Sequence, residues 1–145
     1  MNFKKQADRL EKFLEDEFSS KIPIIVLPNS DLVYKRYKIK KTKQGIWNLN
    51  HITGDVIDSF RLKATAVMAA KFYDNSRFDL YNRVKHLDTG YWTNTVDSLN
   101  FKSRCINSND IDRKALYTAR WELTYHRAKF YQAEISTMFR HSFDK

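Results

Sequence analysis

The C-terminal quarter is the feature that most constrains this chain, because it contains neither glycine nor proline from Asn109 to Lys145. A short polar cluster, Asn107–Asp110, precedes this stretch. Side chains of this kind accept hydrogen bonds from the free N–H groups of a first helical turn. The pattern predicts one long helix from Asn109 to His141.

This helix is predicted to be apolar on two sides. At 100° per residue, one stripe comprises Ile111, Ala115, Leu116, Ala119, Leu123, Phe130 and Ala133, and the second comprises Tyr117, Trp121, Ala128, Ile135 and Phe139. A helix with two apolar sides needs packing partners on both of them. We therefore expect it to lie at the centre of the fold.

The predicted helix is longer than the domain that would contain it. At 1.5 Å per residue it is a rod of about 50 Å, whereas a compact domain of this size has a diameter of roughly 38 Å. The helix must therefore bend, fray or project. If its end projects, the terminal side chains Met138, Phe139 and Phe143 form a candidate interface for another protein chain.

The rest of the chain predicts a small antiparallel sheet covered by helices. We expect a helix over residues 2–19, an edge strand over Ile24–Leu27, and a hairpin of Leu32–Lys41 with Ile46–Ile52. Further helices are expected from Asp55 to about Tyr73, from Ser76 to about His86, and from Tyr91 to Ile106. The predicted fold class is helix-rich α+β, with about three strands packed by four or five helices and a long central C-terminal helix. Residues 1–145 are expected to form a single domain.

Composition narrows the cellular setting. The single cysteine, Cys105, excludes an internal disulfide and a cysteine-based zinc cluster, and a buried thiol is its expected state. The N-terminus is a charged amphipathic stretch, and no apolar run reaches the length of a membrane span, so we expect a soluble, cytoplasmic protein. Ten Phe and eight Tyr, against three Gly and two Pro, favour an A/T-rich genome such as that of a low-GC bacterium or its phage.

Positive charge is concentrated in the predicted hairpin. The formal net charge is +9, and the stretch from Leu32 to Ile52 carries basic residues and no acidic ones. The candidate nucleic-acid-binding residues are Lys35, Arg36, Lys38, Lys40, Lys41 and Lys43, with Tyr37 and Trp47 as aromatic neighbours. Lysines neutralise phosphates and aromatic faces stack on unpaired bases. The alternative is a solvated edge whose lysines prevent aggregation between sheets.

Signals of catalysis are sparse. Glu122 and His126 lie four residues apart on the long helix, where they form either an acid–base pair or a core histidine with its partner. The three glycines form no phosphate-binding loop, and neither a nucleophile elbow nor a metal-ligand spacing occurs. We therefore expect no cofactor and no metal, and an enzyme with an undetected site is the third of three hypotheses.

Two other hypotheses rank above an enzyme. The first is a non-enzymatic protein that binds nucleic acid or another polyanion through the basic hairpin. The second is a structural, assembly or adaptor protein that uses the end of its C-terminal helix to bind a copy of itself or another protein. No membrane partner is expected, and neither the hairpin nor the helix carries a family motif.

Overall fold

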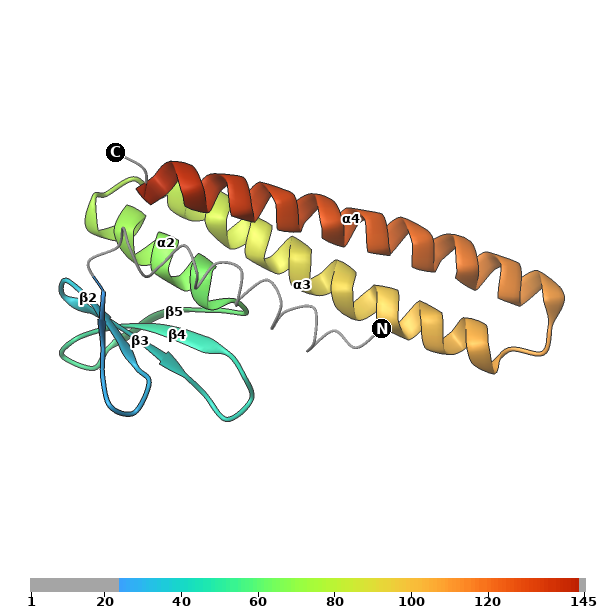
Figure 1. Cartoon of the computed structure of the whole chain (residues 1–145), viewed down its shortest axis with the longest axis horizontal. Helices are drawn as coiled ribbons and strands as arrows, with labels where there is room; N and C mark the ends of the chain where they lie inside the picture. The colour runs from blue at the N-terminus through green and yellow to red at the C-terminus, as the bar shows by residue number, and fades with distance from the viewer. Residues whose placement is uncertain (1–23, 144–145) are drawn as a thin grey trace.

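The computed structural model describes residues 24–143, and the helix predicted over residues 2–19 lies outside them. Within the described residues, the chain forms a five-stranded antiparallel sheet followed by three helices (Figure 1), which confirms the α+β class. The strands are β1 (Ile25–Val26), β2 (Leu32–Tyr34), β3 (Tyr37–Lys41), β4 (Trp47–His51) and β5 (Val56–Phe60). The helices are α2 (Lys63–Asp74), α3 (Phe78–Asn107) and α4 (Ile111–Phe143). The predicted numbers of strands and helices are wrong, because residues 24–143 form five strands and three helices, two of which are 30 and 33 residues long.

The sheet is a meander in which each strand pairs with the next one along the chain, in the order β1-β2-β3-β4-β5. One face is apolar, since Leu32 lies opposite Ile39, which in turn lies opposite Leu49, and all three are almost fully buried. The other face is polar, with Lys38 opposite Asn50 on the next strand. The predicted alternation between a core side and a wet side is confirmed, and so is the edge position of the short first strand.

Two segments of the sheet were predicted incorrectly. Leu32–Lys41 is not one strand, because a turn at Lys35 and Arg36 divides it into β2 and β3. Val56–Phe60 is a strand and not the start of a helix. Gly54, at a φ of 113°, closes a hairpin in which the His51 N–H donates to the Asp55 carbonyl. The turn residues that were interpreted as a strand stop and a helix cap therefore join two paired strands.

The central helix is α2, not α4. It is alanine-rich and buried along nearly its whole length, with Ala64, Ala66, Ala69 and Ala70 fully inaccessible to solvent. Small side chains allow the sheet on one side and the helices on the other to approach its backbone closely. Lys71 anchors α4 to this helix, because its Nζ donates to the Ser142 carbonyl at the C-terminal end of α4.

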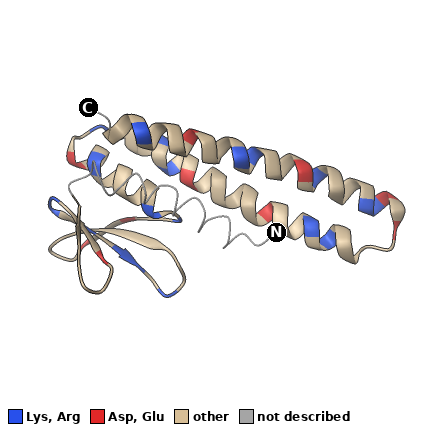
Figure 2. Cartoon of the chain, in the orientation of Figure 1, with Lys and Arg blue, Asp and Glu red and all other residues tan. Residues whose placement is uncertain are grey.

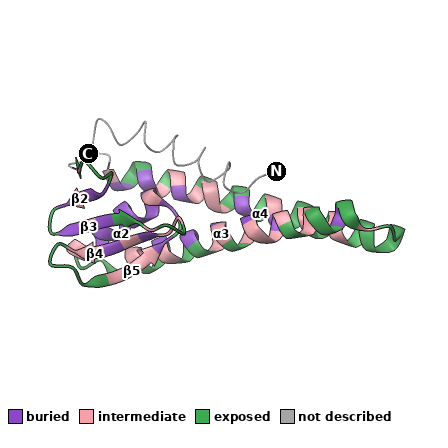
Figure 3. Cartoon of the chain, turned by 90° about the horizontal axis from the view of Figure 1, so that it is seen from below, coloured by how far each residue is buried: buried purple, intermediate pink, exposed green. Residues whose placement is uncertain are grey.

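The last two helices form a long antiparallel hairpin that runs past the sheet and α2 (Figure 1). The predicted long helix is confirmed with slightly shifted ends, and Asp110 caps it by accepting the N–H of Asp112 at 2.9 Å. Its central position is wrong. Toward the tip of the hairpin, α3 is the one described element against which α4 packs, and residues from its first predicted stripe, such as Leu116 and Leu123, are exposed (Figure 3).

The single helix α3 replaces the two helices that were expected on either side of Asp88-Thr89-Gly90. Both turn-type residues have tertiary roles inside this helix. Asp88 points inward to the start of α2, and Gly90 lies against the ring of Tyr131 on α4. Neither α3 nor the other helices within residues 24–143 combine the length and apolarity needed to cross a membrane.

A carboxylate on β5 joins the sheet to α3. Asp58 accepts hydrogen bonds from Tyr81 Oη at 2.6 Å and from Lys85 Nζ at 3.0 Å. Burial opposes ionisation of this carboxyl, but the hydrogen bonds from Tyr81, Ser59 and Lys85 outweigh burial and lower its pKa. A lowered pKa means that Asp58 contributes stability above the ordinary aspartate pKa, and that this contribution is lost as the pH falls through the folded-state pKa.

We therefore expect Asp58→Asn to lower the free energy of unfolding by about 1 kcal/mol at pH 7, since the site is partly exposed. The difference from the wild-type protein should shrink between about pH 5 and pH 3. Urea unfolding followed by circular dichroism measures it. Asp55→Asn, in the exposed β4–β5 turn, removes the same charge without these bonds and serves as the control. A difference that stays constant with pH would contradict the assigned role of Asp58.

Candidate polyanion interface

The predicted basic residues lie at three places in the sheet (Figure 2). Lys35 and Arg36 form the turn between β2 and β3. Lys38 alternates with the buried Ile39 along β3, and its cross-strand neighbour is the polar Asn50. The third group lies at the opposite end of β3, where Lys41 ends the strand and Lys43 belongs to the β3–β4 turn. Lys40 pairs with Asn48 on the polar face beside this third group.

Two carboxylates form ion pairs with half of these cations. Asp74, at the end of α2, lies 3.2 Å from Lys35 Nζ and 3.3 Å from Arg36 Nε. The hydrogen bond with Asp74 raises the pKa of the Lys35 ammonium, so this residue stays charged. Lys38 Nζ lies 3.5 Å from Asp31. These three residues therefore have partners within the fold, and together with the two carboxylates they leave one net positive charge.

The two predicted aromatic residues face the core. Tyr37 is 3% exposed and packs edge-on against Tyr73, with the ring centroids 5.8 Å apart. Trp47 is 9% exposed and lies opposite Phe60 on the neighbouring strand. Because protein atoms cover these rings, an aromatic contact with a ligand has to come from elsewhere in the chain.

One end of the sheet gathers cations from separate segments. We call Lys41, Lys43, Arg61 and Lys63 the cationic end. The ammonium groups of Lys41 and Lys63 lie 5.6 Å and 5.8 Å from the centroid of the Trp47 ring, so β3 and α2 place charges around the same indole. Among the described carboxylates, none lies within ion-pair distance of Lys41, Lys43 or Arg61.

Sequence analysis missed Arg61 and Lys63. They flank Leu62, which is fully buried, so both are directed away from the core while they connect β5 to α2. The available signal was the alternation of Arg61, Leu62 and Lys63, which is typical of an extended segment. It was hidden because a helix was expected to run through this region.

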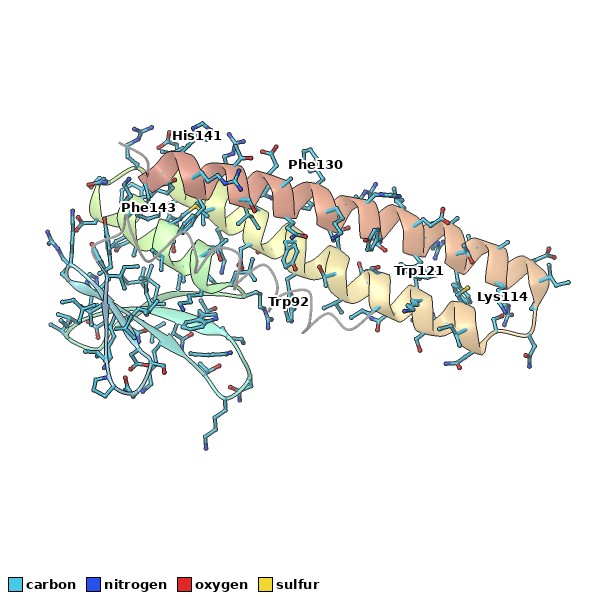
Figure 4. The ribbon with its side chains drawn as sticks, in the orientation of Figure 1. Trp92, Lys114, Trp121, Phe130, His141 and Phe143 are labelled. Atoms are coloured by element: carbon cyan, nitrogen blue, oxygen red, sulfur yellow. The ribbon has the colours of Figure 1, made fainter. Side chains whose placement is uncertain are left out.

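A cavity of about 240 Å³ lies beside the cationic end, between β5 and α3. Arg61 supplies positive charge to its wall, and Thr89 and Thr93 supply hydroxyl groups. Lys85 also lines the cavity, but it is paired with Asp58. The Arg61 guanidinium lies 5.1 Å from the centroid of the Trp92 ring, which also lines the cavity (Figure 4). Guanidinium and hydroxyl groups are the donors that bind phosphate oxygens in proteins.

The two carboxylates nearest this cavity are already engaged. Asp58 accepts a hydrogen bond from the Lys85 ammonium group at 3.0 Å. Asp88 lines the cavity but is 1% exposed, and its oxygens accept hydrogen bonds from the start of α2. Burial raises the pKa of the Asp88 carboxyl, which reduces the negative charge that it would present to an anion.

The other sequence candidates do not assemble into a reactive site. Glu122 and His126 are both exposed on α4, and no hydrogen bond joins them within the described part of the chain. The expectation that His126 lies in the core is wrong, because it lies on an exposed face of α4. Cys105 is buried as expected, with its Sγ 3.1 Å from Thr118 Oγ1. No group of three or more metal-ligating side chains occurs in residues 24–143.

The proposed interface at the end of α4 lies against the core. Phe139 is 1% exposed, and Met138 and Phe143 are half-buried around it. The Lys71 ammonium lies 4.8 Å from the centroid of the Phe143 ring. The end of α4 that extends past the sheet is its N-terminal end, so the large exposed apolar groups of this helix lie there and along its middle.

Comparison with protein-family models, with curated proteins and with solved structures gives no match for this chain.

Proposed function

We propose that this protein binds a polyanion, with the phosphate backbone of a nucleic acid as the ligand class, through the cationic end of its sheet. The observation that carries the proposal is the convergence of Lys41, Lys43 and Arg61 from separate segments without a described acidic partner. Unpaired cations on one surface release counterions when they meet phosphates, and this release drives binding.

The neighbouring cavity suits the same ligand. A phosphate group that enters it meets the Arg61 guanidinium and the hydroxyl groups of Thr89 and Thr93. Lys40 extends the positive surface onto the outer face of β3. The surface offers charge and hydroxyl donors, so we expect backbone recognition with little dependence on base sequence.

The experiment is a salt titration with a fluorescently labelled 20-nucleotide DNA, single-stranded and as a duplex, followed by fluorescence anisotropy. For about four phosphate contacts, log K should fall with log salt at a slope of about −3 to −4. Lys41→Gln with Lys43→Gln should make this slope shallower by about 2, because two contacts are lost.

The matched control is Lys35→Gln with Arg36→Gln, which removes the same charge at the opposite end of β3. Since both residues already pair with Asp74, this variant should change the slope by less than the Lys41 and Lys43 variant does. Equal weakening by both pairs would mean that only net charge matters. A binding affinity that does not change with salt concentration would overturn the proposal.

A further inference from the structure

The outer face of α4 carries exposed apolar residues seven positions apart. Leu116, Leu123 and Phe130 are 48%, 49% and 62% exposed, and Phe130 projects away from α3 (Figure 4). Ala119 and Ala133 are also exposed, and they lie three residues after Leu116 and Phe130. We call these five residues the outer stripe. A single isolated apolar residue needs no explanation, but a row on one helix face does.

The outer stripe is not the side of α4 that packs within the chain. Thr124, Ala128 and Ile135 are the buried positions in this part of the helix, and they face α3. At 100° per residue, these positions point roughly opposite to the outer stripe. The seven-residue spacing, with a second residue three positions later, is the pattern of a seam between two helices.

We propose that the outer stripe binds a second copy of this chain, with the two α4 helices parallel. The residues that flank the stripe carry the charges that such a pair needs. Glu122 and Lys129 lie on one side of it, and Arg127 and Glu134 lie on the other. In a parallel pair of helices, each residue on the first side of the stripe lies beside a residue on the second side of the partner helix. The number of that partner residue is higher by five.

This rule places unlike charges together at both positions where two charged residues meet. Glu122 lies beside the partner's Arg127, and Lys129 lies beside the partner's Glu134. Glu134 already pairs with Arg83 of its own chain at 3.2 Å, and the partner's Lys129 joins them. An antiparallel pair would instead bring Arg120 close to the partner's Arg127, and the two like charges would repel.

The seam is short, so the association is weak. From Leu116 to Phe130 it spans about 22 Å of helix. Its three large apolar residues, Leu116, Leu123 and Phe130, are separated along the helix by the small Ala119 and the polar His126. We expect a dissociation constant on the order of 10 μM, as for the smaller transient interfaces. The sheet lies on the side of α3 away from α4 and leaves the stripe accessible (Figure 1).

Sedimentation velocity of the full chain between about 2 and 200 μM tests the proposal. The wild-type protein should pass from monomer to dimer over this range, whereas Leu123→Glu should stay monomeric with an unchanged circular dichroism spectrum. Ile106→Glu is the matched control, because Ile106 is 65% exposed but lies on α3 and not on the helix that carries the stripe. A wild-type monomer at 200 μM, or equal effects of the two variants, would overturn the proposal.

Charge exchange tests the orientation. Glu122→Arg should weaken dimerisation about tenfold, because two unlike pairs become like pairs. Adding Arg127→Glu should restore it in a parallel pair. Arg127→Glu alone separates the two orientations. It should weaken a parallel pair, in which residue 127 meets the partner's Glu122, and strengthen an antiparallel pair, in which it meets the partner's Arg120. Failure of this rescue, with dimerisation of the wild-type protein intact, would exclude the parallel arrangement.

Discussion

Replacing Asp88 by alanine is expected to lower the free energy of unfolding by about 3 to 5 kcal/mol, which is a large part of the stability of a domain this size. The carboxyl of Asp88 accepts the N–H of Arg61 at 3.0 Å, the N–H of Leu62 at 3.2 Å and the hydroxyl of Thr65 at 2.6 Å. Alanine would leave these donors unsatisfied in a region where Asp88 itself is 1% exposed. Helix α2 would then start without a cap, since Leu62 has no side chain able to provide one.

The effect of pH on this variant has a definite sign. Burial raises the pKa of Asp88, so its proton-linked contribution to stability is complete below the ordinary aspartate pKa and is lost as the pH rises through the folded-state value. The Thr65 hydroxyl also lies 2.9 Å from the Leu62 carbonyl. When Asp88 is protonated, its O–H can donate to the Thr65 oxygen. The single proton of the Thr65 hydroxyl is then free to be donated to the Leu62 carbonyl. The deficit of Asp88→Ala should therefore be larger at pH 4 than at pH 7.

Chemical unfolding followed by circular dichroism at both pH values measures this deficit. Asp97→Ala is the control, because it removes a carboxylate from the same helix at a half-buried site without these bonds. Asp88→Asn should lie between the wild-type protein and Asp88→Ala, since its amide oxygen still accepts a hydrogen bond. A loss below about 1 kcal/mol for Asp88→Ala would show that the N–H groups of α2 find other partners.

Asp88 also explains why helix boundaries were predicted incorrectly. From sequence, Asp88-Thr89-Gly90 is typical of a helix end, and Leu62 offers no sign of a helix start. The cap of α2 comes from a residue of α3 that is distant in the chain. Local pattern correctly predicted the long C-terminal helix and the pairing of β3 with β4. It could not identify a cap supplied by tertiary contact.

The candidate site was predictable to a similar extent. The turn signal correctly placed Lys43 in the bend between two strands, with Lys41 at the end of the first of them. Lys35 and Arg36 pair with Asp74 because the end of α2 folds beside the β2–β3 turn. No local sequence signal reveals this tertiary contact. Periodicity also identified Leu116, Leu123 and Phe130 as one apolar face. It gives no information on whether the partner of that face lies in the same chain.

The second large effect is expected at Gly90, where α3 passes closest to α4. A Cβ atom at this position would lie 2.5 Å from Tyr131 Cζ and 2.6 Å from Tyr131 Cε1, well inside van der Waals contact. In an unobstructed helix, Gly→Ala raises stability by up to about 1 kcal/mol. Here the half-buried Tyr131 ring must move away from His86, whose ring centroid lies 6.0 Å from its own. We expect Gly90→Ala to lower the free energy of unfolding by about 1 to 2 kcal/mol, and Gly90→Val by about 3 kcal/mol.

A double-mutant cycle separates the clash from any general effect of altering this helix. In a Tyr131→Ala background the obstructing ring is absent, so Gly90→Ala should raise stability by about 0.5 to 1 kcal/mol, through helix propensity alone. The sign of the Gly90→Ala effect should thus reverse between the two backgrounds, with a coupling energy of about 2 kcal/mol. Chemical unfolding of the four proteins measures it. If Gly90→Ala has the same sign in both, the close approach of α3 to α4 does not depend on this glycine, and its place within a continuous helix has another cause.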